Sequence, residues 1–203
     1  MSFIHAPAVP FRAHRTYLHS TTLYKEIIAG AENTGLMPDG AVELRVRRLM
    51  RRQPELHYSR SPLLLADDAP AVFSLSAGGM AWHGAVIERD APIGNREPYD
   101  ETAVLSRAVA DGSSIRVNGP TGMHPIEVIT SLTLLLHQRL FEIEQDRKWY
   151  LARIALARPL QMPDTDQITV ALARRFGKTM TRCAISSGDE SLGFIEFIVG
   201  PIG

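Results

Sequence analysis

His124 and its neighbours carry the strongest signal for chemistry in this sequence. His124 stands directly before Pro125, where apolar residues begin to recur at spacings of three and four and predict a helix. The amides and the positive dipole end of a helix N-terminus favour a carbonyl or anionic oxygen and disfavour an imidazolium. A neutral His124 is therefore a candidate base or orienting group beside an oxyanion site. The alternative is a loop histidine that only caps the helix.

Polar residues around His124 complete this first candidate site. Asn118 and Glu127 are further candidates for catalytic roles, and Thr121 is a candidate for substrate binding. Each has an ordinary structural explanation as well. Asn118 begins a segment typical of a plain turn, and Glu127 falls on the polar face of the predicted helix, where solvation is the usual outcome.

A second helix start lies in the N-terminal half of the chain. Ser20 and Thr21 follow His19, and an apolar stripe at helical spacing begins directly after them. If the halves of the chain are related, this position corresponds to that of His124, and the two hydroxyls are candidates for substrate binding. Hydroxyls that cap the helix are the simpler explanation.

Arginine is concentrated between residues 41 and 60, which hold six of these residues. Arg45 and Arg47 are the candidates for substrate contact, since guanidinium planes match phosphates of coenzyme A, a nucleotide or RNA. A solvated edge strand is the alternative. The chain has 22 basic and 22 acidic residues, so no net field attracts nucleic acid, which is not an expected partner.

The remaining histidines and the cysteine give little support to a metal or a cofactor, and none is expected. His57 and His83 fall in predicted strands, from which one could reach a cleft as a base, although such histidines are more often surface residues. No histidines stand two or four apart, as in common metal sites. Cys183 is the one cysteine, and we expect it to be a small buried filler.

The elements that must position these residues recur in the same order in two halves, 15–90 and 113–203. In the first half the pattern predicts a strand at Thr16–His19, a helix after Ser20, a strand segment at 41–59 and a hairpin about Gly78-Gly79. In the second half it predicts a strand at 114–118 and a nearly enclosed helix from Pro125 to Ile143. Strands follow at 149–157, 168–174, 178–186 and 192–199.

Two segments lack a clear period. Residues 1–14 contain two prolines and predict an irregular arm. Residues 91–112 predict a connector between the halves, with a short helix over 99–110.

This order of elements resembles the double hot-dog fold. The tail RRFGKTMTRCAISSGDESLGFIEFIVG resembles its closing strands, and GMHPIEVITSLTLLLHQRLFE resembles the loop and helix of thioester-acting members and of relatives that make butyrolactone signals. The resemblance implies an α+β fold of two β-α-β-β-β-β halves that form a pseudo-dimer, with antiparallel sheets wrapped on long helices. The aspartate-to-histidine signature of hydratases is only approximated by Asn118 and His124.

The resemblance leads us to expect a protein that binds or acts on an acyl thioester, carried by coenzyme A or an acyl-carrier protein. A thioesterase or a dehydratase would fit. The alternative is a non-catalytic module of the same fold that binds a small molecule or assembles with itself as a homo-oligomer. No apolar run approaches the roughly 20 residues of a membrane span, and no secretory signal is evident, so we expect a cytoplasmic protein without membrane contact.

Overall fold

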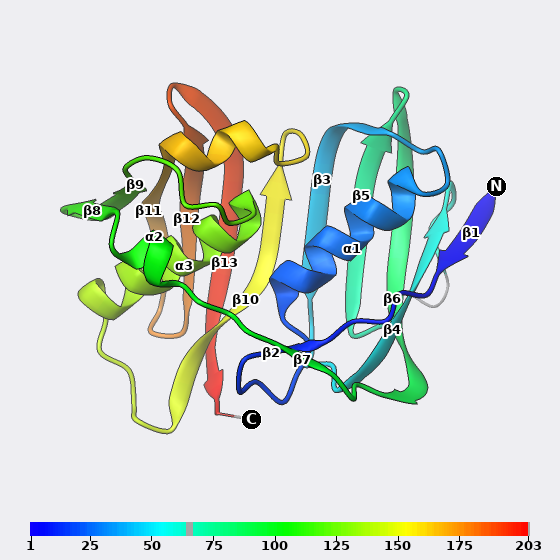
Figure 1. Ribbon diagram of the computed structural model, residues 1–203, viewed down its shortest axis with the longest axis horizontal. Helices are drawn as coiled ribbons and strands as arrows, with labels where there is room; N and C mark the ends of the chain where they lie inside the picture. Colours follow the sequence, from blue (N-terminus) through cyan, green and yellow to red (C-terminus); the bar gives the residue numbers. More distant parts are fainter. Residues whose placement is uncertain (64–66, 203) are drawn as a thin grey trace. The chain divides into compact units, whose positions relative to one another are not determined.

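The computed structural model describes residues 1–63 and 67–202, and the chain divides into two units, Met1–Tyr99 and Asp100–Gly203. In the first unit an antiparallel sheet has the order β1-β4-β6-β5-β3, and α1 lies across one face of it (Figure 1). Its elements are β1 (Ser2–His5), β2 (Phe11–Arg12), α1 (Ser20–Glu32), β3 (Pro38–Val46), β4 (Arg52–Ser59), β5 (Ala71–Ala77), β6 (Met80–Pro92) and β7 (Arg96–Glu97).

The alternation of residue types explains the two faces of this sheet. In β5, Phe73 and Leu75 are buried, whereas Val72 and Ser74, which alternate with them, are partly exposed. The predicted hairpin between β5 and β6 is confirmed. Its turn is Gly78-Gly79, with φ values of 57° and 71°, the left-handed conformations that a two-residue hairpin turn requires.

The helix α1 packs closely on the inner face of the sheet. Leu23 and Ile27 are fully buried, and the Tyr58 hydroxyl donates a hydrogen bond to the Ile27 carbonyl at 2.9 Å. Gly30 makes this approach possible, because a Cβ atom there would lie 2.6 Å from both the Tyr58 hydroxyl and the His5 ring. Burial, with a contribution from Glu26, raises the pKa of Tyr58, so this hydroxyl stays protonated.

The second unit repeats the theme of an antiparallel sheet and a helix, with the strand order β10-β13-β12-β11-β9-β8 (Figure 1). The prediction that its helix is nearly enclosed is confirmed, since most residues of α3 are buried. The elements are α2 (Thr102–Leu105), β8 (Ala108–Asp111), β9 (Ser114–Val117), α3 (Pro125–Leu140), β10 (Arg147–Leu156), the 3₁₀ helix η2 (Met162–Gln167), β11 (Ile168–Phe176), β12 (Met180–Ser187) and β13 (Glu190–Pro201).

The α+β class is therefore confirmed, and each unit has the helix and antiparallel strands that the hot-dog resemblance implies. The pseudo-dimer formed by the halves stays a prediction. No helix among the described residues is long and apolar enough to cross a membrane.

Several local predictions need correction. The arm expected to be irregular over 1–14 contains β1, which pairs with β4 and stacks Phe3 on Tyr58 at 4.3 Å between ring centroids. The strand expected at Thr16–His19 is absent, and the strand that precedes α1 in this sheet is β1. Both errors have one cause: partners distant in sequence decide whether a short segment becomes a strand.

Two further segments differ from their predicted form. The segment 41–59 forms β3 and β4 separately, and Pro54 is tolerated in β4 at a register shift. The connector predicted over 91–112 spans the boundary between the two units. The short helix expected over 99–110 is limited to α2, and the edge strand β8 follows it.

Candidate functional site

His124 occupies the N-cap position of α3, where its main chain is extended and its side chain points back to the helix. Its Nδ1 atom accepts a hydrogen bond from the Ile126 amide at 3.3 Å. In return, the Glu127 carboxylate accepts a hydrogen bond from the His124 amide at 3.2 Å. These reciprocal bonds form a capping box, in which a histidine replaces the usual serine or threonine.

The capping box fixes the tautomer of the neutral His124 ring. Because Nδ1 is an acceptor, a neutral ring carries its proton on Nε2. Nδ1 cannot act as a base in this arrangement, because its lone pair already accepts this hydrogen bond. The Ile126 amide is also bonded, although we expected the first amides of the helix to be available to a substrate oxygen. The half-buried ring therefore carries its donor hydrogen on Nε2.

The structure brings together only part of the first candidate set. Glu127 is buried rather than solvated, because its carboxylate completes the capping box. Thr121 shapes the preceding loop, where its hydroxyl accepts from the Met123 amide at 3.2 Å. Asn118 is exposed, and its main-chain amide bonds to the Arg107 carbonyl at 3.0 Å.

The start of α1 has a different construction. His19 is the N-cap residue, but no side chain there caps the helix, so the prediction that a Ser20 or Thr21 hydroxyl caps it is wrong. Ser20 is the first helical residue and is partly exposed. Thr21 is fully buried, and its hydroxyl lies 2.6 Å from His19 Nδ1.

The environment of His19 keeps it neutral. Burial, followed by the charges of Arg15, Arg12 and Lys25, lowers the pKa of His19 to about 3. The ring also lies against Tyr99, at 5.3 Å between centroids. With its Nδ1 bonded inside the unit and its pKa so low, His19 is built for packing rather than for proton transfer.

A third histidine, His137, was missed by sequence reasoning and lies in the core of the second unit. It is fully buried in α3, with Nε2 at 2.9 Å from the Thr181 hydroxyl and 3.7 Å from the Cys183 sulfur. Nδ1 of His137 has no hydrogen-bond partner among the described residues. The signal available in the sequence was its position four residues after Thr133, on the same face of the predicted helix.

Burial governs the chemistry of this internal group. It lowers the pKa of His137 to about 4 and raises the pKa of Cys183 to about 12, so both side chains are neutral near pH 7. The prediction that Cys183 is a buried filler is confirmed by its full burial. In the described parts of the chain, no three His, Cys, Asp or Glu side chains are grouped to hold a metal ion.

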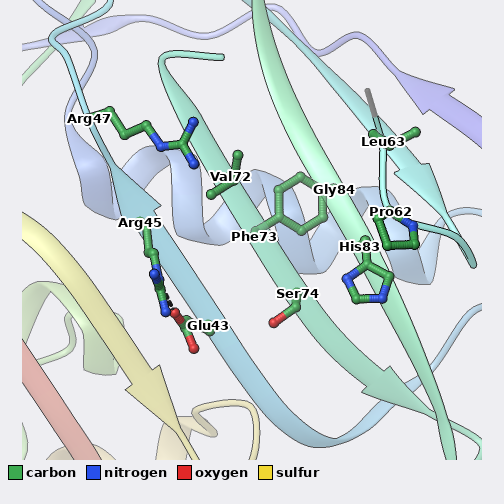
Figure 2. Close-up of a pocket in the computed structure, with 10 residues that line it drawn as sticks. All are labelled: Glu43, Arg45, Arg47, Pro62, Leu63, Val72, Phe73, Ser74, His83 and Gly84. Atoms are coloured by element: carbon green, nitrogen blue, oxygen red, sulfur yellow. Dashed lines mark hydrogen bonds and ion pairs between the residues drawn. The ribbon is translucent and has the colours of Figure 1, made fainter. Parts of the chain in front are cut away.

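Arg45 and Arg47, the other candidates for substrate binding, line a pocket in the first unit (Figure 2). The pocket has a volume of about 290 Å³ and lies on the sheet face opposite α1. Sequence reasoning missed Ser74, although its place in the alternating pattern of β5 gives it this orientation. The lining residues are Glu43, Arg45, Arg47, Pro62, Leu63, Val72, Phe73, Ser74, His83 and Gly84.

No protein-family model and no curated protein matches this chain. Solved structures similar to it include the pyran synthase domain from module nine of the sorangicin pathway, with 12% identity, a TM-score of 0.47 and coverage of 100% of this chain and 93% of that chain. The dehydratase domain of PpsC from Mycobacterium tuberculosis, solved with C12:1-CoA, has 13% identity, a TM-score of 0.44 and coverage of 91% and 85%.

An acyl-ACP thioesterase from Bacteroides thetaiotaomicron is also similar, with 8% identity, a TM-score of 0.38 and coverage of 98% of this chain and 97% of that chain. Each TM-score lies below 0.5.

Proposed function

We propose that the protein binds and acts on an acyl thioester, with His124 holding the thioester carbonyl. The observation that carries this proposal is the capping box at the start of α3, which fixes the His124 ring with Nε2–H as its donor. A thioester carbonyl oxygen is a matching acceptor. Its charge grows when a nucleophile attacks the carbonyl carbon, so a donor that is already oriented stabilises the transition state more than the ground state.

The surroundings of His124 suit this role in two ways. The positive end of the α3 dipole lies beside the ring and strengthens its interaction with a developing negative charge. Glu127 accepts a hydrogen bond from the main-chain amide of His124 and so helps to fix the position of this residue. We therefore assign His124 as the group that contacts the substrate and Glu127 as a positioning residue.

The test uses a panel of acyl-CoA and acyl-carrier-protein thioesters with chain lengths from acetyl to dodecanoyl. Thiol release measures turnover, and thermal unfolding with each compound measures binding. We expect at least one thioester to raise the Tm of the wild-type protein and to be consumed. A panel without turnover and without stabilisation would reject the proposal.

His124→Ser is the decisive variant, because it separates catalysis from capping. Serine is a favoured N-cap, and with Glu127 three residues later it completes an ordinary capping box. We expect wild-type Tm and a loss of turnover of about a hundredfold, the usual effect of removing one oxyanion donor. Full turnover in His124→Ser would show that the histidine only caps the helix.

The capping geometry also favours the second candidate, a non-catalytic binding module, because a satisfied cap explains His124 without chemistry. That module would show stabilisation by a ligand, no consumption of any thioester, and identical ligand binding in wild type and His124→Ser.

A further inference from the structure

The pocket on the outer face of the first sheet is built by register across three strands. Glu43 of β3 stands opposite Ser74 of β5, which in turn stands opposite His83 of β6. Directly opposite residues share one face of a sheet, so these side chains form a single row. Figure 2 shows the row beside the two arginines, with the strands between it and α1.

Positive charge dominates this pocket. Arg45 and Arg47 are its basic residues, and Glu43 is the acid that lines it. Arg45 pairs with Glu43 through Nε, and Arg47 donates from an Nη to the Asp67 carbonyl at 2.9 Å. Each guanidinium has five N–H donors, so it can bind an anion in addition to the protein groups that orient it.

The arginines on the outer face of the second sheet are used differently. There Arg182 is paired with the buried Glu196, and its guanidinium lies 4.4 Å from the centre of the Phe194 ring. Arg153 also lies over Phe194, at 4.9 Å. Arg182 and Arg153 therefore pack on a phenylalanine ring, whereas Arg45 and Arg47 line a pocket.

Size and surface chemistry restrict the ligand. A volume of about 290 Å³ lies just below the range for small-molecule pockets, roughly 300 to 1,000 Å³, so the pocket matches a small ligand better than it matches an enclosed coenzyme. Val72, Pro62 and Leu63 add apolar surface next to the polar row. An anionic group with a short apolar chain matches both parts.

We propose that this pocket binds a small organic anion, with a carboxylate or phosphate group held by Arg45 and Arg47 and a short apolar chain against Val72. Ser74 and His83 supply further hydrogen bonds to the anionic group. The site does not depend on the activity proposed for His124, and it remains testable if that activity is absent.

The direct test is calorimetric titration of the full chain at low ionic strength with four probes that share a hexyl chain or an anionic group: hexanoate, hexyl phosphate, hexylamine and inorganic phosphate. We expect hexanoate, hexyl phosphate or both to bind, with affinity that falls as salt is added. The first two probes distinguish a carboxylate ligand from a phosphate ester. Equal binding of hexylamine, or no binding of either anionic hexyl compound, would overturn the proposal.

Two variants that should change the affinity in opposite directions test whether the anion binds in this pocket. Arg45→Gln removes one charge-assisted partner and should weaken binding roughly tenfold. Glu43→Gln removes the repelling carboxylate and should strengthen it a few-fold. Arg174→Gln is the control, since it makes the same change in net charge at an exposed position of β11 in the other unit, and binding should stay within about twofold.

A second route leaves every charge in place. Ser74→Leu puts a larger side chain into the pocket and should abolish binding, with the unfolding transition as a check on the fold. Equal weakening by Arg45→Gln and Arg174→Gln, or unchanged binding in Ser74→Leu, would show that the anion binds elsewhere.

Discussion

The helix α1 of the first unit and the helix α3 of the second unit both have a histidine at the N-cap position, but the two histidines have different roles. His124 caps α3 with its ring and stays half-buried. The side chain of His19 does not cap α1; it is buried and bonds to Thr21 within its own unit. The same residue type at the same helix position thus caps the helix in one unit and packs in the interior of the other.

The sheets differ in a comparable way. Four main strands follow the helix in each unit. In the first unit the first of them, β3, pairs with the third, β5. In the second unit the first, β10, pairs with the fourth, β13. The link between the second and third strands after the helix explains part of this difference. In the second unit three residues, 177–179, join β11 to β12, and so short a loop makes these neighbours pair as a hairpin. In the first unit the longer link of residues 60–70 separates β4 from β5, and β5 pairs with β3 and β6 instead. The units therefore share element order and not strand pairing.

Lowering the pH should produce the largest change in the free energy of unfolding, because a histidine is buried in each unit. The folded-state pKa values are about 3 for His19 and about 4 for His137, below the ordinary 6.5. As pH falls below 6.5, these two histidines become protonated in the unfolded chain but stay neutral in the folded chain, so the free energy of unfolding decreases. Over the full range the losses are about 5 kcal/mol for His19 and about 3 kcal/mol for His137.

Urea unfolding at neutral pH and near pH 4 measures this loss. His137→Gln should remove the share of the pH dependence that belongs to the second unit. If that variant kept the wild-type slope, His137 would not be neutral in the folded chain.

Replacing each N-cap histidine by serine should have the next largest effect on stability, and the effect should differ between His19 and His124. His19→Ser removes a buried ring and should cost about 3 kcal/mol, in the range of other large-to-small core changes. His124→Ser keeps a capping box and should stay within about 0.5 kcal/mol. Denaturant midpoints measure both, and equal losses would erase the distinction drawn here.

Close packing of α1 gives a smaller expected effect. Gly30→Ala places a Cβ atom 2.6 Å from the Tyr58 hydroxyl, so the helix must shift, at a cost of about 1–3 kcal/mol. Gly94→Ala is the control, because nothing lies within 4 Å of its Cβ position. Thermal unfolding compares the two, and an undisturbed Gly30→Ala would show that α1 packs more loosely than the structure indicates.

The smallest effect concerns the capping box of α3. Glu127→Ala removes its second bond and should cost about 1 kcal/mol, whereas Glu127→Gln can keep it and should be nearly neutral. Turnover should follow the same order if Glu127 positions His124. A loss in Glu127→Gln as large as in Glu127→Ala would indicate a role for the charge itself.

Sequence pattern was a good guide where structure is local. The stripe from Pro125 predicted an enclosed α3, and Gly78-Gly79 predicted the β5–β6 turn, because helical periodicity and left-handed glycines act within a few residues. It failed at β1, whose strand character comes from β4, more than fifty residues away. It also failed to foresee that Glu127 is buried, since its helix face alone suggested solvent.

The sequence by itself determined the α+β class, the two helices with their apolar faces, and His124-Pro125 as a helix start. Tertiary structure alone decided which strands pair. It also decided that His19 is buried whereas the side chain of His124 caps α3, and that Arg45, Ser74 and His83 line one pocket. The physical reason is distance along the chain. Periodicity and turn chemistry act over a few residues, whereas burial, pKa and cross-strand neighbours depend on segments that only the fold brings together.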